Sequence, residues 1–283
     1  ALAFYVPDEV VAQLAKNIVD IKKAGQVVYG ACLFTDAAGY TTLSEKLNPQ
    51  ELSDFMHKYF ETLFEPVKKH GGFVVDLKGD SILAVWKAAQ ADAALRNRAC
   101  LAALDISRGV ERFNRSYDDL DLPTRIGVHS GEIFLGNVGA GDHYEYRPTG
   151  DTVNTASRMD GLNKYLGTEC LVSEEVLQGL DGFLTREVGT FRFKGKAQPV
   201  LVHELLCRRE EADQKQKLLC AVFAEALGAF KRSSWDEAKE KFEQAIEKSA
   251  SDGPARFYVK LCGQYKNTPP EESWAGVVPL EEK

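Results

Sequence analysis

The sequence lacks paired cysteines and long apolar runs. Its six cysteines are scattered and include no Cys-x-x-Cys pair. This pattern argues against a zinc site or a disulfide framework and favours free thiols in a reducing compartment. No apolar run approaches the ~18 residues that a membrane helix needs. We therefore expect a globular chain rather than a membrane-spanning or disulfide-stapled one.

Positive charge is also scarce. The chain has 35 Lys and Arg residues against 42 Asp and Glu residues, a formal net charge of -7. A general nucleic-acid binder needs a basic surface to neutralise phosphates, so this class is disfavoured. The lack of exposed aromatic strand motifs disfavours an RNA-binding sheet as well. A nucleoside triphosphate is compatible with the charge, because one local basic cluster is enough to hold it.

The 283 residues leave room for about two domains of ~150 residues each. Three segments differ in pattern: residues 1–25, residues 26–206 and residues 207–283. The first predicts one amphipathic helix, with Leu14, Ile18 and Ile21 at helical spacing. Such a helix must bury its apolar stripe, either on its own domain or in a parallel helix pair of a dimer.

The middle segment alternates strand-like and helical patterns. The apolar run Val27–Phe34 predicts a strand, and Asn48-Pro49 opens a helix that Gly71-Gly72 ends. Apolar runs on either side of Lys78–Ser81 predict a hairpin, and we expect a second hairpin at Gly131. This α+β alternation predicts a sheet with helices packed on one face.

The last segment changes character after a charged linker. Two helical segments, at 218–230 and 235–248, predict a hairpin whose spacing resembles half of a tetratricopeptide (TPR) repeat. One helix pair cannot bury a solenoid core by itself. We therefore expect this TPR-like hairpin to dock on the preceding domain, on a dimer mate or on a partner. The tail around Trp274 is typical of an extended strap held by that side chain.

Two aspartates follow strand-like runs. Asp36 lies within Phe34–Thr41, and Asp80 lies in the turn Lys78–Ser81. Phosphate-bound Mg²⁺ takes one or two carboxylates from a protein, and two aspartates can hold two metal ions over a triphosphate for an in-line displacement at phosphorus. Small residues after Asp36 let the backbone approach a polyphosphate, and the helix start that follows offers N–H groups to its oxygens.

Two further motifs carry polar side chains suited to phosphate chemistry. They are Arg125–Glu132 and Gly150–Arg158. In the second, Asn154 and Arg158 are four residues apart and therefore share one helix face. An amide and a guanidinium on one face can hold a ribose oxygen and neutralise the charge that grows on a phosphorane.

Together, these four ordered motifs resemble the catalytic domain of class III nucleotidyl cyclases, the adenylyl and guanylyl cyclase homology family, over roughly residues 26–206. The resemblance implies a ferredoxin-like βαββαβ core. The flanks resemble those of bacterial receptor-type cyclases, in which a sensor and a membrane region precede a coupling helix like residues 1–25. We therefore expect the cytoplasmic part of a longer, membrane-anchored signalling protein.

The resemblance implies a role for each motif. Asp36 and Asp80, together with Ala37, would bind two Mg²⁺ or Mn²⁺ ions per active site. Asn154 would orient the ribose, and Arg158 would stabilise the transition state. The implied substrate-binding residues are Phe34, Gly39, Tyr40, Thr41, Asp76, Arg125, Arg147 and Lys194. In this family the site forms between two subunits, so a homodimer is implied. The metal aspartates come from one chain, and the asparagine, arginine and lysine come from the other.

Two positions depart from the family pattern. Adenylyl cyclases usually place Lys four residues before the second metal aspartate, and Asp or Thr seven residues before the ribose asparagine. This chain has Asp76 and Arg147 there. Asp76 suits guanine, as in guanylyl cyclases, but it can also accept from the adenine amino group while Arg147 donates to a ring nitrogen. In a third alternative, the two side chains pair across the subunit interface and touch no base.

We interpret the chain as a metal-dependent adenylyl cyclase that converts ATP to 3′,5′-cyclic AMP and pyrophosphate in signal transduction. This choice of base rests on the frequency of adenylyl cyclases among bacterial members of the family. A guanylyl cyclase and a degenerate, nucleotide-binding sensor are the alternatives. The four catalytic side chains are all present, which disfavours the sensor.

Overall fold

The computed structural model describes residues 25–117, 120–140, 143–271 and 273–280. The helix predicted for residues 1–25 lies outside this part of the chain, except for Gly25, which begins the first strand. None of the helices in the described ranges is long and apolar enough to cross a bilayer. All six cysteines are free thiols, as predicted, and five of them are buried.

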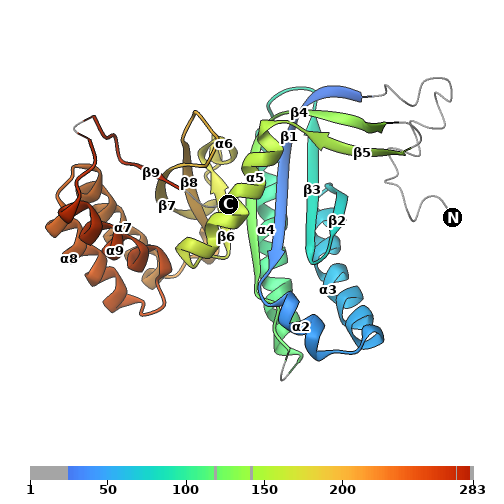
Figure 1. Ribbon diagram of the computed structural model, residues 1–283, viewed down its shortest axis with the longest axis horizontal. Helices are drawn as coiled ribbons and strands as arrows, with labels where there is room; N and C mark the ends of the chain where they lie inside the picture. The colour runs from blue at the N-terminus through green and yellow to red at the C-terminus, as the bar shows by residue number, and fades with distance from the viewer. Residues whose placement is uncertain (1–24, 118–119, 141–142, 272, 281–283) are drawn as a thin grey trace.

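The first part of the chain forms the predicted βαββαβ core (Figure 1). Its strands lie in the order β2-β3-β1-β4, and each neighbouring pair is antiparallel. This order is that of a ferredoxin-like sheet, and it places the end of β1 beside the β2–β3 turn. The elements are β1 (Gly25–Ala37), α2 (Tyr40–Lys46), α3 (Pro49–Lys69), β2 (Phe73–Lys78), β3 (Ser81–Ala88), α4 (Ala93–Arg115) and β4 (Thr124–Ala140).

The second part extends the same sheet beyond β4. Strand β6 pairs with β4 in parallel, β8 and β7 follow, and β5 forms a hairpin with the far end of β4. Helix α5 connects β5 to β6 and crosses in front of the sheet in Figure 1. The elements are β5 (His143–Thr149), α5 (Asp151–Leu166), β6 (Cys170–Ser173), α6 (Glu174–Leu177), β7 (Phe183–Arg192), β8 (Val200–Arg208) and the 3₁₀ turn η3 (Arg209–Glu211).

The start of helix α3 follows the sequence prediction closely. The Asn48 side chain accepts from the backbone N–H groups of Gln50 and Glu51, and the Glu51 side chain accepts from the Asn48 backbone, which completes a capping box. Pro49 occupies the first helical position, where no intrahelical donor is needed. The helix ends just before Gly71, as predicted.

The prediction that helices cover one face of the sheet was wrong. Helices α3 and α4 pack on the face that carries Ala31, Leu33 and Trp86. Helix α5 packs on the opposite face, where Val153 and Ala156 join Val28, Cys32, Leu83, Val85, Ile133 and Leu135. Side chains of successive strand residues point to opposite faces, so the alternating apolar residues of β1 and β3 supply both cores.

The hairpin predicted at Gly131 was also wrong, because β4 runs straight through this residue and pairs with β1 along its length. Glycine is needed here for a close approach rather than for a turn. A Cβ on Gly131 would lie 2.7 Å from Thr152 Oγ1, at the start of α5. Likewise, a Cβ on Gly127 would lie 2.3 Å from the backbone nitrogen of Asp160. The glycines of β4 therefore let α5 lie directly on the strand.

The C-terminal segment contains three helices rather than the predicted two, followed by a short strand. These are α7 (Gln214–Lys231), α8 (Trp235–Lys248), α9 (Gly253–Asn267) and β9 (Val277–Pro279). We call this segment, Gln214–Leu280, the C-terminal module. Of the docking alternatives, the structure bears out packing on the preceding domain: Phe223, Phe230 and Tyr258 share one core with Val188 and Phe191 of β7. Figure 1 shows the module beside β7 and β8.

A buried charge cluster joins this module to the sheet. Arg186 on β7 donates from Nε to Glu204 Oε2 on β8 at 2.9 Å, and Nη1 pairs with Asp252 at the start of α9. The side chains of Arg186 and Asp252 are only 5% and 1% exposed. Asp252 also caps α9 by accepting from the Ala255 backbone N–H. One arginine therefore neutralises two carboxylates from two different elements.

Candidate active site

The two predicted metal ligands lie side by side. Asp36 is near the end of β1, and Asp80 is in the turn between β2 and β3. The backbone N–H of Ala37 donates to Asp80 Oδ2 at 3.1 Å, which fixes this carboxylate next to its neighbour. Thr35 adds a second link, because its Oγ1 accepts from the Ile82 N–H at 3.2 Å. The ferredoxin-like strand order thus brings the two halves of the acidic motif together.

Two cationic side chains lie against Asp36. Arg125, opposite Asp36 in the β1–β4 ladder, places Nη1 3.3 Å from Asp36 Oδ2, and Lys164 Nζ lies 3.3 Å from the same oxygen. Burial raises the pKa of Asp80, and the negative charge of Asp36 adds to that shift. A site that crowds carboxylates and draws positive side chains is suited to a divalent cation.

A third carboxylate lies near this site and was missed by the sequence analysis. Burial raises the pKa of Asp160, on α5, to about 8, and the negative charge of Asp36 contributes. Its Oδ1 atom is buried and accepts no hydrogen bond from the residues that the structure describes. Within the described residues, no group of three or more His, Cys, Asp or Glu side chains could hold a metal ion by itself. Two carboxylates fit an ion that shares its remaining coordination with phosphate and water.

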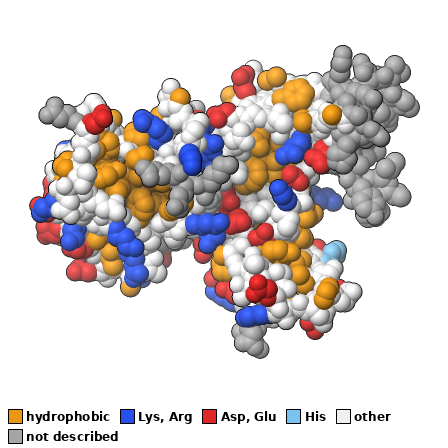
Figure 2. Space-filling view, viewed as in Figure 1, with side chains coloured by type: hydrophobic (Ala, Val, Ile, Leu, Met, Phe, Trp, Pro, Cys, Tyr) orange, Lys and Arg blue, Asp and Glu red, His pale blue; other side chains and the backbone are white. Residues whose placement is uncertain are grey.

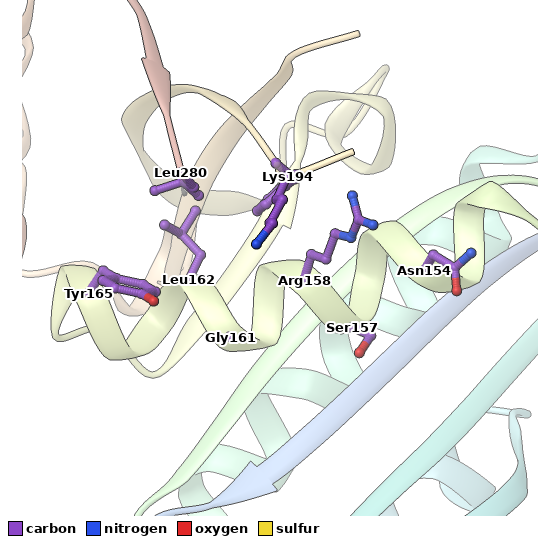
Figure 3. A pocket seen from close by; sticks show the side chains of 9 residues that line it. Asn154, Ser157, Arg158, Gly161, Leu162, Tyr165, Lys194 and Leu280 are labelled. Carbon is purple, nitrogen blue, oxygen red and sulfur yellow. The ribbon is translucent and has the colours of Figure 1, made fainter. Parts of the chain in front are cut away.

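The predicted catalytic pair opens on a separate pocket. Asn154 and Arg158 project from one face of α5 into a cavity of about 390 Å³, and Lys194 faces them from the loop after β7 (Figure 3). The Nη1 atom of Arg158 is buried and has no hydrogen-bond partner within the described part of the chain. An unpartnered guanidinium beside a lysine is a site for an anionic oxygen. The other lining residues are Ser157, Gly161, Leu162, Tyr165, Phe193 and Leu280.

The neighbouring lysine of the same loop has a different role. Lys196 Nζ lies 2.7 Å from Asp151 Oδ2 and also contacts Thr155, so it binds the loop to the start of α5. Lys194 is exposed and lines the pocket. This agrees with the prediction of Lys194 as the phosphate-binding lysine, a role that stays a prediction.

Helix α5 separates the two sets of predicted residues. Asn154 and Asp160 are six residues apart, as are Arg158 and Lys164, so each pair is separated by about 120° around the helix axis. Lys164 turns toward Asp36, whereas Asn154 and Arg158 turn into the pocket. Neither metal aspartate lines that pocket. The structure therefore brings together Asp36 with Asp80, and separately Asn154 with Arg158 and Lys194.

The predicted base-reading residues meet within one chain. Arg147 Nη2 on β5 lies 3.9 Å from Asp76 Oδ2 on β2, and Arg147 Nη1 lies 3.4 Å from Glu145 Oε2. Both members of the Asp76–Arg147 pair are about four-tenths exposed. Strands β2 and β5 of the same chain supply this contact, and the alternative of a pair across a subunit interface that touches no base stays a prediction. The residues stay beside one another and accessible to a ligand.

The other predicted residues around Asp36 have different surroundings in the fold. Ala37 is buried and offers its N–H to Asp80. Gly39 caps the start of α2, and Thr41 is exposed within it. Phe34 and Tyr40 are partly buried against the cores on opposite faces of the sheet. Their predicted contact with substrate stays a prediction.

This arrangement can be compared with known proteins. The model of the adenylate and guanylate cyclase catalytic domain family matches residues 21–206. The chain belongs to this family. Catalytic domains of the family are metal-dependent in general, which agrees with the paired aspartates.

Curated relatives of this cyclase domain are longer proteins. Adenylate cyclase 1 of Rhizobium meliloti (strain 1021) is 36% identical over 211 residues, which are 72% of this chain and 31% of that protein. The adenylate cyclase of Anabaena cylindrica is 28% identical over 217 residues, 71% of this chain and 42% of that protein. The chain thus spans less than half the length of these two relatives.

Solved structures of both cyclase types share the fold. A bacterial light-regulated adenylyl cyclase superimposes with a TM-score of 0.63 at 21% identity, covering 77% of this chain and 64% of that one. The adenylyl cyclase CyaB from P. aeruginosa gives 0.59 at 22% identity, covering 67% and 100%. The guanylyl cyclase Cya2 gives 0.58 at 24% identity, covering 67% and 97%. The fold therefore does not distinguish between the two bases.

Proposed function

We propose that this chain is the catalytic part of an adenylyl cyclase, which converts ATP to 3′,5′-cyclic AMP and pyrophosphate at sites shared between two copies. The observation that carries the proposal is the division of the predicted residues over two separate surfaces. The aspartate pair lies near Lys164 of α5, and the Arg158 pocket lies about 120° away around that helix. Two copies are needed to bring the two surfaces together.

Each side chain has a distinct chemical role in this proposal. Asp36 and Asp80 would hold two Mg²⁺ or Mn²⁺ ions, which would supply activation of the ribose 3′-hydroxyl and neutralisation of the triphosphate charge. Asn154 fixes the ribose through its amide. Arg158 donates to the oxygens of the reacting phosphorus, where charge grows in the transition state. Lys194 binds the polyphosphate and holds the pyrophosphate as it leaves.

The choice of ATP is supported by the relatives that are named adenylate cyclases. In the structure, Arg147 lies beside Asp76 and offsets its charge, so the pair presents both a donor and an acceptor. Such a pair can accept from the adenine amino group and donate to a ring nitrogen. A guanylyl cyclase is the second candidate, because Asp76 can instead accept from the N–H groups of guanine. Purified protein assayed with Mn²⁺ and either ATP or GTP tests the choice, and faster turnover of GTP would contradict it.

The shared site has its own test. Asp36→Ala and Arg158→Ala should each be inactive alone, since every site of either homodimer lacks one group. An equal mixture should recover about one quarter of wild-type activity, because half of the dimers are mixed and each mixed dimer has one intact site. Asp54→Ala, on the exposed face of α3, is the matched control and should stay active. A mixture that stays inactive would contradict the two-chain site.

A further inference from the structure

The C-terminal strap, Trp274–Leu280, extends the sheet to the edge of the Arg158 pocket. Its strand β9 runs parallel to β7, with Thr190 opposite Val277 and Arg192 opposite Pro279. One residue further on, the Leu280 N–H donates to the Arg192 carbonyl at 3.0 Å, which continues the ladder. The strap therefore pairs with β7 as far as Arg192, the last residue of that strand, which lies two positions before Lys194.

The other end of the strap is anchored in the C-terminal module. Trp274 donates from Nε1 to the Val277 carbonyl at 2.7 Å. Its ring packs against Phe230, Trp235 and Tyr265, with ring centroids 5.2 to 5.6 Å apart. These three rings come from α7, α8 and α9. All three helices of the module therefore hold the strap in place.

The strap delivers one side chain to the pocket. Leu280 lines the cavity together with Leu162 and Tyr165 of α5 and with Lys194 (Figure 3). Leu280 packs against the core cluster to which Leu162 belongs. The pocket thus has a polar side, formed by Arg158 and Lys194, and an apolar wall that the strap completes. Figure 2 shows hydrophobic side chains gathered on this flank of the molecule, around the module.

We propose that Leu280 is a positioning residue that holds the Lys194 loop against α5, so that the C-terminal module forms part of the nucleotide site. The loop between β7 and β8, residues 193–199, is bound to α5 mainly through Lys196, which contacts Asp151 and Thr155. Its other described contacts include the backbone hydrogen bond from the Lys196 N–H to the Phe193 carbonyl and the buried Phe193 ring, and the strap pairs with the end of β7 just before the loop. Leu280 packs against the core cluster that contains Phe193 of this loop and Leu162 of α5. This proposal rests on the proposed function, since it assigns Lys194 to the polyphosphate.

The first experiment measures binding of a non-cyclisable methylene analogue of ATP, with Mn²⁺, by calorimetry. Leu280→Ala should weaken binding about tenfold, because it removes apolar contacts that hold the loop, and a loss of about 1.4 kcal/mol is a factor of about ten in affinity. In steady-state assays KM should rise while kcat changes little, since the lysine holds substrate in the ground state as well. Leu280→Met keeps the wall and should bind within about threefold of wild type. Pro279→Ala, exposed on the same strap, is the matched control and should bind as wild type.

The second experiment does not depend on nucleotide. Amide hydrogen exchange of residues 193–199 should be faster in Leu280→Ala than in wild type or Pro279→Ala, while exchange in α3 and α4 stays the same. Unchanged exchange and unchanged analogue binding in Leu280→Ala would each overturn the proposal. If wild-type protein bound no analogue, the proposed function would fail, and hydrogen exchange alone would still decide whether the strap braces the loop.

Discussion

Replacing Arg186 with methionine should strongly destabilise the protein. This arginine is 5% exposed and faces Glu204 and Asp252, which are 13% and 1% exposed. Methionine fills much of the same volume but leaves two carboxylates buried without a counter-charge. Breaking a buried ion pair in this way costs about 3–5 kcal/mol. The guanidinium also lies 4.7 Å from the Phe223 ring centroid, so some cation–π attraction is lost as well.

The assay is thermal and urea unfolding of the whole chain. For a chain of this size, the expected loss corresponds to a fall in Tm of roughly 6–20 °C. Lys231→Met is the matched control, because Lys231 pairs with Glu187 on the same strand but both side chains are at least one-third exposed. An exposed pair contributes about 0–1 kcal/mol. Equal losses in the two variants would refute the argument that burial sets the cost.

The pH dependence provides a second check. Burial raises the pKa of Glu204, whose unperturbed value is 4.5, although Arg186 acts in the opposite direction. Without the arginine this pKa rises further. In the variant, the Glu204 carboxyl keeps its proton in the folded state over a pH range in which the unfolded state releases it. The stability that comes from this proton is present at low pH and is lost as the pH rises through the pKa of Glu204 in the folded state. The difference in the free energy of unfolding between Arg186→Met and wild type should therefore become smaller as the pH falls toward 4.5. A constant difference would contradict this reasoning.

Three further predictions concern the site itself. Chelation with EDTA should abolish cyclic nucleotide production, and added Mn²⁺ should restore it. The variant Asp80→Asn should stay inactive at any Mn²⁺ concentration. Activity without metal would contradict the assignment of Asp36 and Asp80 as metal ligands. Lys164→Met removes a cation from Asp36 and should tighten Mn²⁺ binding about two- to fivefold in an EPR titration, since an exposed pair contributes up to about 1 kcal/mol; weaker binding would refute competition. Gly127→Ala forces a Cβ onto the α5 backbone and should cost about 1–3 kcal/mol in urea unfolding. At Gly161 an added Cβ would meet no described atom within 4 Å beyond its own helix turn, so Gly161→Ala should leave the free energy of unfolding unchanged, and equal losses in the two variants would contradict the close approach.

The elements that the sequence predicts well are those with local signals. The Asn48 capping box and the apolar strand runs depend on residues close together in the chain, so their patterns are readable directly. The acidic pair was predictable for another reason. Asp36 lies near the end of β1, and Asp80 lies just before β3, the strand that the ferredoxin-like order places next to β1, so motif order together with this fold places the two aspartates side by side.

The elements that the sequence predicts poorly depend on packing between distant segments. A glycine in the middle of an apolar strand pattern predicts a turn. Only the position of α5 shows that Gly131 instead allows the helix to lie close to the strand. Helix α9 begins at Gly253-Pro254, residues that usually mark a break. Asp160 and Lys164 lie outside the motif that ends at Arg158. Only plotting the residues after Arg158 around the helix axis would have shown that α5 has a second polar face.

Helix α5 and the strap together explain why the C-terminal module belongs with this catalytic domain. Arg158 is fixed by α5, which the glycines of β4 hold close to the sheet. Lys194 is on a loop at the opposite edge of the pocket, beyond the end of β7. Without β9, strand β7 would be the exposed edge of the sheet, since its other neighbour is β8. The module covers this edge through the strap and packs its helices on the same strand. It thereby stiffens the end of β7, from which the Lys194 loop leaves the sheet.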